Sequence, residues 1–136
     1  MNRAAMLSLL EQDEGLRLKP YRDHLGKLTL GIGRNLDDVG ITPEEARHLA
    51  ENDIGRCEAA LDKNRPWWRQ LSEARQRILV SMVFQLGWSG VAGFTKFWAA
   101  VQREDWPGAA VEMRDSLWAK QTPARCERLA KMMEAG

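Results

Sequence analysis

One short stretch of strand-like alternation, in a chain whose pattern is otherwise helical, most constrains the fold. Apolar residues alternate there with polar or small ones, the period-two signal of β-strands. The alternating apolar residues are Leu16, Leu18, Leu28, Leu30 and Ile32. The segment from Asp23 to Lys27 is predicted to be the turn between two strands. We therefore expect one β-hairpin centred near Gly26, with Asp23 directly opposite Thr29.

The remainder of the chain has the period of amphipathic helices. A helix over residues 3 to 13 would take Asn2 as its N-cap and stop at Gly15. The run from Thr42 to Glu45 supplies a cap, a first-turn proline and the acid of a capping box. It predicts a helix of about 20 residues that ends before Pro66. Further helices are predicted over residues 72–87, 95–103, 106–115 and 123–134, the last two capped by Asp105 and Thr122.

These elements predict an α+β fold that is mostly α-helical, in a single domain over residues 1–136. The expected architecture is a small β-hairpin lobe joined by a long helix to a helical lobe. We assign about residues 14–62 to the hairpin lobe with its connecting helix. Residues 1–13 and 63–136 are assigned to the helical lobe.

Charge and composition argue against several functional classes. The chain has 20 basic and 19 acidic residues, for a net charge of +1, so no large basic field favours nucleic acid or an anionic membrane. No apolar run approaches the ~20 residues of a membrane span, and the N-terminus reaches Glu11 too early for a secretory signal. His24 and His48 are isolated, so no metal site is predicted. We expect no nucleic-acid partner, no membrane anchor and no cofactor.

Cysteine and tryptophan residues are predicted to belong mainly to the core. Cys57 and Cys126 fall at apolar helical positions, where lone cysteines are usually buried free thiols. Among the six tryptophans, Trp106 and Trp118 are assigned to the core. Trp88 lies in a glycine-rich connection, and its pattern leaves two roles open: core packing or the border of a binding cleft.

Three residues around the predicted hairpin carry functional groups suited to breaking a glycosidic bond. Glu14 lies at the end of a helix, where the negative end of the macrodipole favours the protonated form that a general acid needs. Asp23 and Thr29 could hold a water molecule. Each residue alone has an ordinary explanation, as a surface acid, a turn aspartate and a strand threonine. Together they predict an acid, a base and a water-positioning hydroxyl.

Three collinear blocks of the sequence resemble the phage-type lysozymes, the small peptidoglycan-cleaving endolysins of glycoside hydrolase family 24. The first block runs from Asp13 through Tyr21, Asp23, Gly26 and Thr29 to Gly31-Ile32-Gly33. The second comprises Met82-Val83-Phe84-Gln85 and Gly90-Val91-Ala92-Gly93-Phe94-Thr95, and the third comprises Trp118, Gln121-Thr122-Pro123 and Arg125. The resemblance covers most of the chain in order and implies a lysozyme-like fold.

The resemblance implies a role for each matched residue. Glu14 would be the general acid, while Asp23 and Thr29 would hold and activate the attacking water, which gives inversion at the anomeric carbon. The bond would be the β-1,4 link between N-acetylmuramic acid and N-acetylglucosamine. Arg125 would approach Glu14 and orient it. The residues expected to contact substrate are Phe84, Gln85, Asn35 and Leu36.

The sequence departs from the family in one region. The best-known members carry His directly after Gly-Ile-Gly, where this chain has Arg34. The stretch from Arg34 to Thr42 is also short, which predicts a smaller hairpin lobe and weakens the transfer of roles to Asn35 and Leu36.

The resemblance further implies a monomeric enzyme of host cell lysis. It would accumulate in the host cytoplasm and reach the periplasmic cell wall after release by a holin-type membrane partner. Two alternatives stay open at this point. A lytic transglycosylase would use the acid without a water, and a catalytically silent peptidoglycan-binding or structural module, for example in a phage tail, would need none of the three residues.

Overall fold

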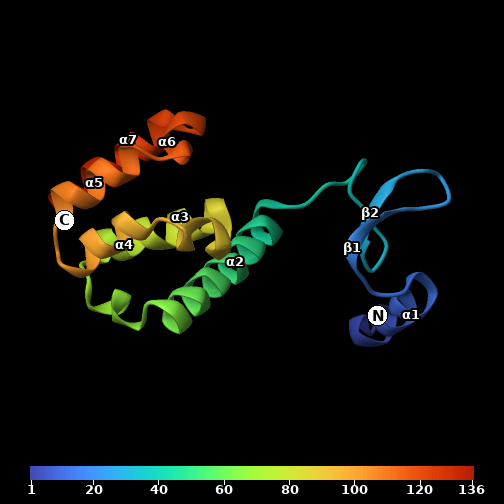
Figure 1. Ribbon diagram of the computed structural model, residues 1–136. Coiled ribbons are helices and arrows are strands. Elements are labelled where there is room, and N and C mark those ends of the chain that lie inside the picture. The colour runs from blue at the N-terminus through green and yellow to red at the C-terminus, as the bar shows by residue number, and fades with distance from the viewer. The chain divides into compact units, whose positions relative to one another are not determined.

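The computed structural model covers residues 1–136 and has the predicted mostly helical α+β class (Figure 1). In chain order the elements are α1 (Arg3–Glu14), β1 (Arg17–Arg22), β2 (Leu28–Gly31), β3 (Arg34–Asn35), α2 (Pro43–Asn64), the 3₁₀ helix η1 (Pro66–Gln70), α3 (Glu73–Ala92), α4 (Thr95–Gln102), α5 (Trp106–Arg114), α6 (Leu117–Gln121) and α7 (Pro123–Ala135). Two compact units comprise Met1–Leu49 and Ala50–Gly136. The predicted membership of residues 1–13 in the helical lobe stays a prediction.

Helix α1 has the ends that the sequence predicts. The Asn2 Oδ1 atom accepts a hydrogen bond from the Ala5 N–H at 3.0 Å, which is the expected N-cap. At the other end Gly15 has φ 77° and donates its N–H to the Glu11 carbonyl at 2.8 Å. Glu14 is therefore the last residue of the helix, directly before the turn into β1.

The hairpin turn has a different register from the predicted one. The Asp23 N–H donates to the Lys27 carbonyl at 2.9 Å, so residues 24–26 form the loop, with Gly26 at φ 77°. Tyr21, not Asp23, is the partner of Thr29 across the ladder. The prediction that Asp23 lies opposite Thr29 is wrong, because Asp23 is hydrogen-bonded to Lys27, two residues before Thr29. Since side chains alternate with period two, Asp23 and Thr29 still belong to one face of the sheet.

A third strand extends the expected hairpin into a three-stranded antiparallel sheet in the order β1-β2-β3. Gly31 and Gly33 take φ values of 72° and 70°, which turn the chain back after β2. Thr29 then pairs with Asn35 as well as with Tyr21. The central position of β2 buries Thr29, which is 3% exposed.

Helix α2 confirms the capping box and the predicted length. The Thr42 Oγ1 atom accepts from the Glu45 N–H at 3.1 Å, and the Glu45 carboxylate accepts from the Thr42 N–H at 3.0 Å. The helix runs for 22 residues and ends before Pro66. These two bonds give acceptors to the Thr42 and Glu45 N–H groups, which have none within the helix.

Three details of the helical region differ from the predictions. Helix α3 does not end at Gly87: that residue has φ 73° and ψ 161°, but helical turns resume and continue to Ala92. The short helices η1 and α6 were not predicted. Thr122 precedes α7 without capping it, because its hydroxyl lies within hydrogen-bond distance of the Trp118 carbonyl and the Gln85 amide.

The core of the second unit gathers residues from α2, η1 and α3 to α7. Its largest fully buried side chains include Trp68, Trp118, Phe97, Leu61 and Met82. Cys57 and Cys126 are free and buried, as predicted, and burial raises the pKa of both thiols. Trp118 lies in the core, whereas Trp106 is only half-buried, since it packs against the core's edge with the Arg75 guanidinium 3.8 Å above its ring.

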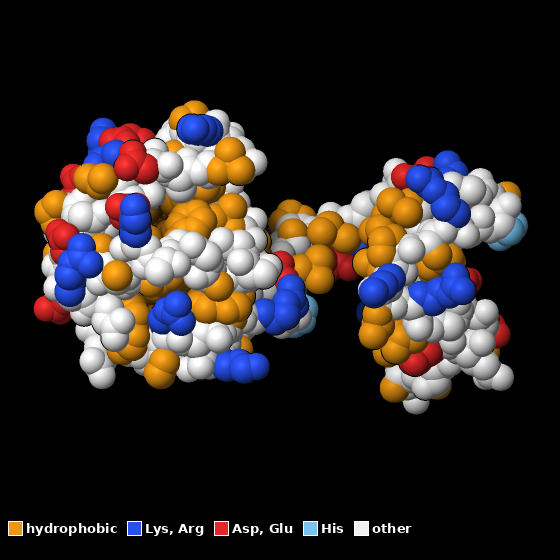
Figure 2. Space-filling model, viewed as in Figure 1, with side chains coloured by type: hydrophobic (Ala, Val, Ile, Leu, Met, Phe, Trp, Pro, Cys, Tyr) orange, Lys and Arg blue, Asp and Glu red, His pale blue; other side chains and the backbone are white.

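No single helix has both the length and the apolar character of a membrane span, although α3 and α4 meet those criteria when taken together across a bend of 109°. Both helices contribute buried residues to the core of the second unit. On the face drawn in Figure 2, Lys and Arg side chains lie in small separate groups among acidic and uncharged ones.

Candidate active site

The side chain of Glu14 lies directly against Gly33. A β-carbon built on Gly33 would come within 2.9 Å of Glu14 Cγ and 3.0 Å of both Cδ and Oε2. Such distances are shorter than van der Waals contact, so the carboxyl group occupies space that only glycine leaves free. The end of α1 and the turn after β2 therefore meet at the predicted general acid.

Asp23 is fixed by the backbone of its own turn. Its Oδ1 atom accepts hydrogen bonds from the N–H groups of Leu25 at 2.9 Å and Lys27 at 2.8 Å. The other carboxylate oxygen, Oδ2, has no hydrogen-bond partner in the protein and can accept one from a bound molecule. The side chain is thus oriented by one oxygen and available through the other.

Thr29 presents its hydroxyl from the central strand. Oγ1 donates to the Lys27 carbonyl at 2.9 Å, which fixes the direction of the hydroxyl proton and leaves its lone pairs as acceptors. Both Asp23 and Thr29 thus bond to Lys27, which links them across the turn. All three residues predicted to be catalytic lie in the first unit.

Arg34, the residue at which the sequence departs from the resemblance, joins the sheet to the start of α2. Its guanidinium donates to both carboxylate oxygens of Glu45, at 2.9 and 2.7 Å, and to the Gly40 carbonyl at 3.0 Å. The guanidinium and the Thr42 N–H lower the pKa of Glu45 from 4.5 to about 2. The same bidentate pair raises the pKa of Arg34.

The predicted substrate contacts in the first unit have local hydrogen-bond partners or partial burial. Asn35 Nδ2 donates to the Asp38 carboxylate at 3.0 Å, and Asn35 Oδ1 accepts the Asp38 N–H at 3.0 Å. Leu36 is half-buried and donates its N–H to the Leu28 carbonyl at 2.7 Å. These bonds stabilise the short connection before α2.

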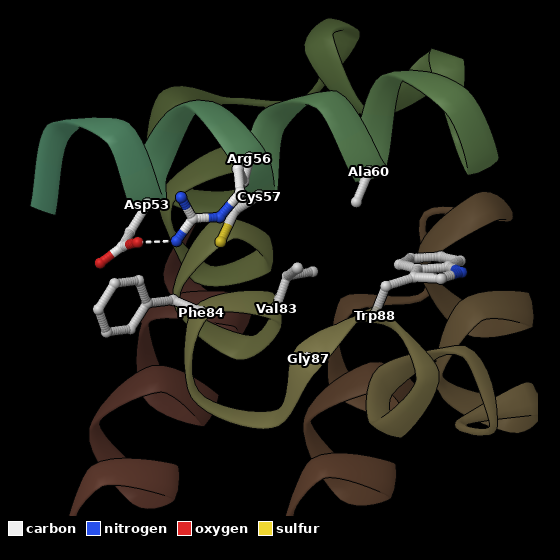
Figure 3. A pocket seen from close by; sticks show the side chains of 8 residues that line it. All are labelled: Asp53, Arg56, Cys57, Ala60, Val83, Phe84, Gly87 and Trp88. Carbon is white, nitrogen blue, oxygen red and sulfur yellow. Dashed lines mark hydrogen bonds and ion pairs between the residues drawn. The ribbon is translucent and has the colours of Figure 1, made fainter. Parts of the chain in front are cut away.

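In the second unit, Phe84 and Trp88 line one groove of about 360 Å³ between α2 and α3. Figure 3 shows Phe84 and Trp88 at opposite ends of this groove, with an ion pair between Asp53 and Arg56 near Phe84. Phe84 is 51% exposed. Trp88 is half-buried and lies beneath the guanidinium of Arg65, 5.3 Å from its ring centroid. Trp88 thus packs against the core, which confirms the first role left open by its pattern, and it also borders a groove; a role in binding stays a prediction.

Gln85 has protein partners at both ends of its amide. Oε1 accepts from the Trp118 indole N–H at 2.8 Å, and Nε2 donates to Thr122 Oγ1 at 3.2 Å. The amide therefore connects α3 to α6 and to the residue before α7. Sequence reasoning gave Gln85 a substrate contact and missed this internal network, which joins residues more than thirty positions apart.

Arg125 donates to Ser81 Oγ at 2.9 Å within the second unit. The predicted approach of Arg125 to Glu14 would join the two units and stays a prediction. Gly33, which lies against Glu14, belongs to the Gly31-Ile32-Gly33 motif, and the sequence indicated no role for it. The chain contains no cluster of three or more His, Cys, Asp or Glu residues placed to hold a metal ion.

Comparison with known proteins decides the family. Residues 11–133 match the protein family described as phage lysozyme. The chain belongs to the phage lysozyme family. By family it is a lysozyme-type glycoside hydrolase, which confirms the resemblance drawn from the three sequence blocks.

The relatives of this chain include a phage spike protein, a lysozyme and an endolysin. The chain is 33% identical to the pre-baseplate central spike protein Gp5 of Enterobacteria phage T4, over 97% of the chain but 28% of Gp5. It is 28% identical to probable T4-type lysozyme 2 of Dictyostelium discoideum, over 98% of the chain and 95% of that protein. It is 32% identical to an endolysin of Acyrthosiphon pisum secondary endosymbiont phage 1, over 84% of the chain and 77% of the endolysin. The chain thus spans just over a quarter of Gp5 and most of the other two.

Proposed function

We propose that this chain is an endolysin that hydrolyses the β-1,4 bond between N-acetylmuramic acid and N-acetylglucosamine in peptidoglycan. One observation carries the proposal: the first unit contains Glu14, Asp23 and Thr29, and the Glu14 carboxyl lies against Gly33. Family membership and the relatives named as lysozymes and as an endolysin support it.

The proposed reaction is a single displacement with inversion. The Glu14 carboxyl gives its proton to the glycosidic oxygen as that oxygen leaves the anomeric carbon. A water oxygen attacks the same carbon from the opposite face, and its proton passes to the Asp23 carboxylate. Asp23 Oδ2 and the Thr29 hydroxyl oxygen supply acceptors for that water, because each has its other bonds satisfied by the turn.

The remaining predicted contacts have supporting roles in the proposal. Phe84 provides an exposed aromatic face against which a sugar ring can pack. Asn35, Leu36 and Gln85 lie in the segments that we propose border the substrate. Arg125 is proposed to orient Glu14, and a metal ion or cofactor has no step in this scheme.

The decisive experiment compares Glu14→Gln with Glu11→Gln in lysis of outer-membrane-permeabilised Gram-negative cells. Both residues lie in α1, but Glu11 is outside the proposed site. We expect Glu14→Gln to lose activity by roughly 10²- to 10⁴-fold, the range of general acid catalysis, and Glu11→Gln to keep it. Wild-type activity in Glu14→Gln would remove Glu14 from the reaction.

The products distinguish hydrolysis from transglycosylation and test the stereochemistry. Mass spectrometry of fragments released in H₂¹⁸O should find one ¹⁸O atom at each new reducing end. Proton NMR during the first turnovers should detect the α-anomer, the product of inversion. Anhydro sugars without added oxygen would instead establish the lytic transglycosylase alternative.

We further propose that the enzyme acts as a monomer in host cell lysis, from the host cytoplasm, after a holin-type partner permeabilises the membrane. Expression of the chain alone should leave host cells intact until chloroform is added. Lysis or periplasmic activity without chloroform would contradict the need for a partner.

A second setting is favoured by one specific observation, the 33% identity to a spike protein of a phage baseplate. In that setting the same hydrolase would be part of the virus particle. Mass spectrometry of purified virions separates the two settings, because a free endolysin would be absent from the particle.

A further inference from the structure

Gly33 combines two constraints that can be separated by experiment. Its φ of 70° is a left-handed conformation that disfavours any side chain, and Gly31 has the same constraint at 72°. The space around the two residues differs. A β-carbon on Gly31 would meet nothing within 4 Å, whereas one on Gly33 would meet three atoms of Glu14 at 2.9 to 3.0 Å.

We propose that Gly33 is a positioning residue for catalysis: because glycine has no side chain, the Glu14 carboxyl can lie against the backbone at this position. This inference rests on the proposed role of Glu14 as general acid. It assigns a function to the second glycine of Gly31-Ile32-Gly33 that the first does not share, although both have the same backbone conformation.

A new β-carbon at position 33 would be accommodated by the carboxyl group, not by the backbone. Glu14 is exposed and its Cγ, Cδ and Oε2 atoms belong to the flexible end of the side chain, so they can move at little cost to folding. To restore ordinary contact they must move by about 0.5 Å or more, which is the tolerance of a catalytic group. The main consequence of the substitution therefore falls on proton transfer and not on stability.

The experiment compares Gly33→Ala with Gly31→Ala in the otherwise wild-type chain. We expect thermal unfolding to shift downward by similar amounts, since both alanines occupy left-handed positions. With solubilised uncrosslinked peptidoglycan as substrate, kcat should fall about 10- to 100-fold in Gly33→Ala, with KM changed less than about twofold. In Gly31→Ala, kcat should stay within about twofold of wild type.

A second pair, Gly33→Asn and Gly31→Asn, tests the same idea with less backbone strain, because asparagine adopts left-handed conformations more readily. These variants keep the β-carbon and remain informative if either alanine variant fails to fold. Equal kcat values for folded variants at positions 31 and 33 would overturn the proposal. A loss of kcat confined to position 33 would support it.

Failure of this proposal can be distinguished from failure of the proposed function. If Glu14→Gln keeps wild-type activity, the assignment of the acid fails and Gly33 has no catalytic side chain to position. If Glu14→Gln is inactive but Gly33→Ala and Gly31→Ala behave alike, the acid is correct and only the role of Gly33 is rejected.

Discussion

Arg34 donates hydrogen bonds from its two terminal nitrogens to the two carboxylate oxygens of Glu45, at 2.9 and 2.7 Å. The pair ties the residue that follows Gly31-Ile32-Gly33 to the first turn of α2. Because Glu45 also completes the capping box with Thr42, one carboxylate serves both the helix start and the sheet. The arginine that distinguishes this chain from the best-known family members thus has a defined structural partner.

The first prediction concerns the pH dependence of stability that this pair produces. The folded pKa of Glu45, about 2, lies below its ordinary value of 4.5. The pair therefore stabilises the folded state above about pH 4.5, and this contribution is lost as pH falls towards 2. The midpoint of thermal unfolding should exceed that of Glu45→Gln at pH 6, and the difference should shrink as the pH is lowered.

The control for this prediction is Glu44→Gln, which changes a neighbouring acid of the same helical turn that forms no ion pair in the structure. Its difference from wild type should vary less between pH 6 and pH 2. A difference for Glu45→Gln that stays constant over this range would show that the pair contributes nothing specific to stability.

The second prediction concerns the partly buried hydrogen bond between Gln85 and the indole of Trp118. Gln85→Met keeps the length of the side chain but leaves the indole N–H of a tryptophan that is 2% exposed without an acceptor. We expect the free energy of unfolding in urea to fall by about 1–3 kcal/mol, the cost of a buried unpaired donor plus the lost bond.

A double-mutant cycle provides the control. In a Trp118→Phe background the donor is already absent, so Gln85→Met should cost less than it does in the wild-type chain. An equal cost in both backgrounds would mean that the bond does not account for the loss. In that event the hydrogen bond from Gln85 to Thr122 would be the next one to test.

The third prediction separates binding from folding at Phe84. Because Phe84 is 51% exposed, Phe84→Ala should change the free energy of unfolding by no more than about 0.5 kcal/mol. If its ring contacts a sugar, KM for solubilised peptidoglycan should rise about 2- to 10-fold, the effect of losing roughly 0.5–1.5 kcal/mol of aromatic contact.

Val111→Ala is the matched control, since Val111 is 50% exposed on α5 and lies outside the groove of Phe84. It should leave both KM and stability near wild type. A KM for Phe84→Ala that matches the Val111→Ala value would remove Phe84 from the substrate contacts.

Much of the local structure could be predicted from the sequence because the signals act over a few residues. Asn2 caps α1, Gly15 ends it, and Thr42 with Glu45 begins α2, each through bonds between neighbours in the chain. Gly87 is an exception, because it interrupts α3 without ending it. The surrounding residues pack into the core, and the helix resumes after it.

The sequence by itself determined the helix boundaries that local caps set and the turn at Asp23, and it led to the proposal of the three catalytic residues. Only the tertiary structure decided which residues meet: Tyr21 rather than Asp23 beside Thr29, Gly33 beneath Glu14, and Gln85 between Trp118 and Thr122. The physical reason is range. Caps and turns depend on dihedral preferences and hydrogen bonds within one turn of chain, whereas register and side-chain contact depend on how separate segments close on one another.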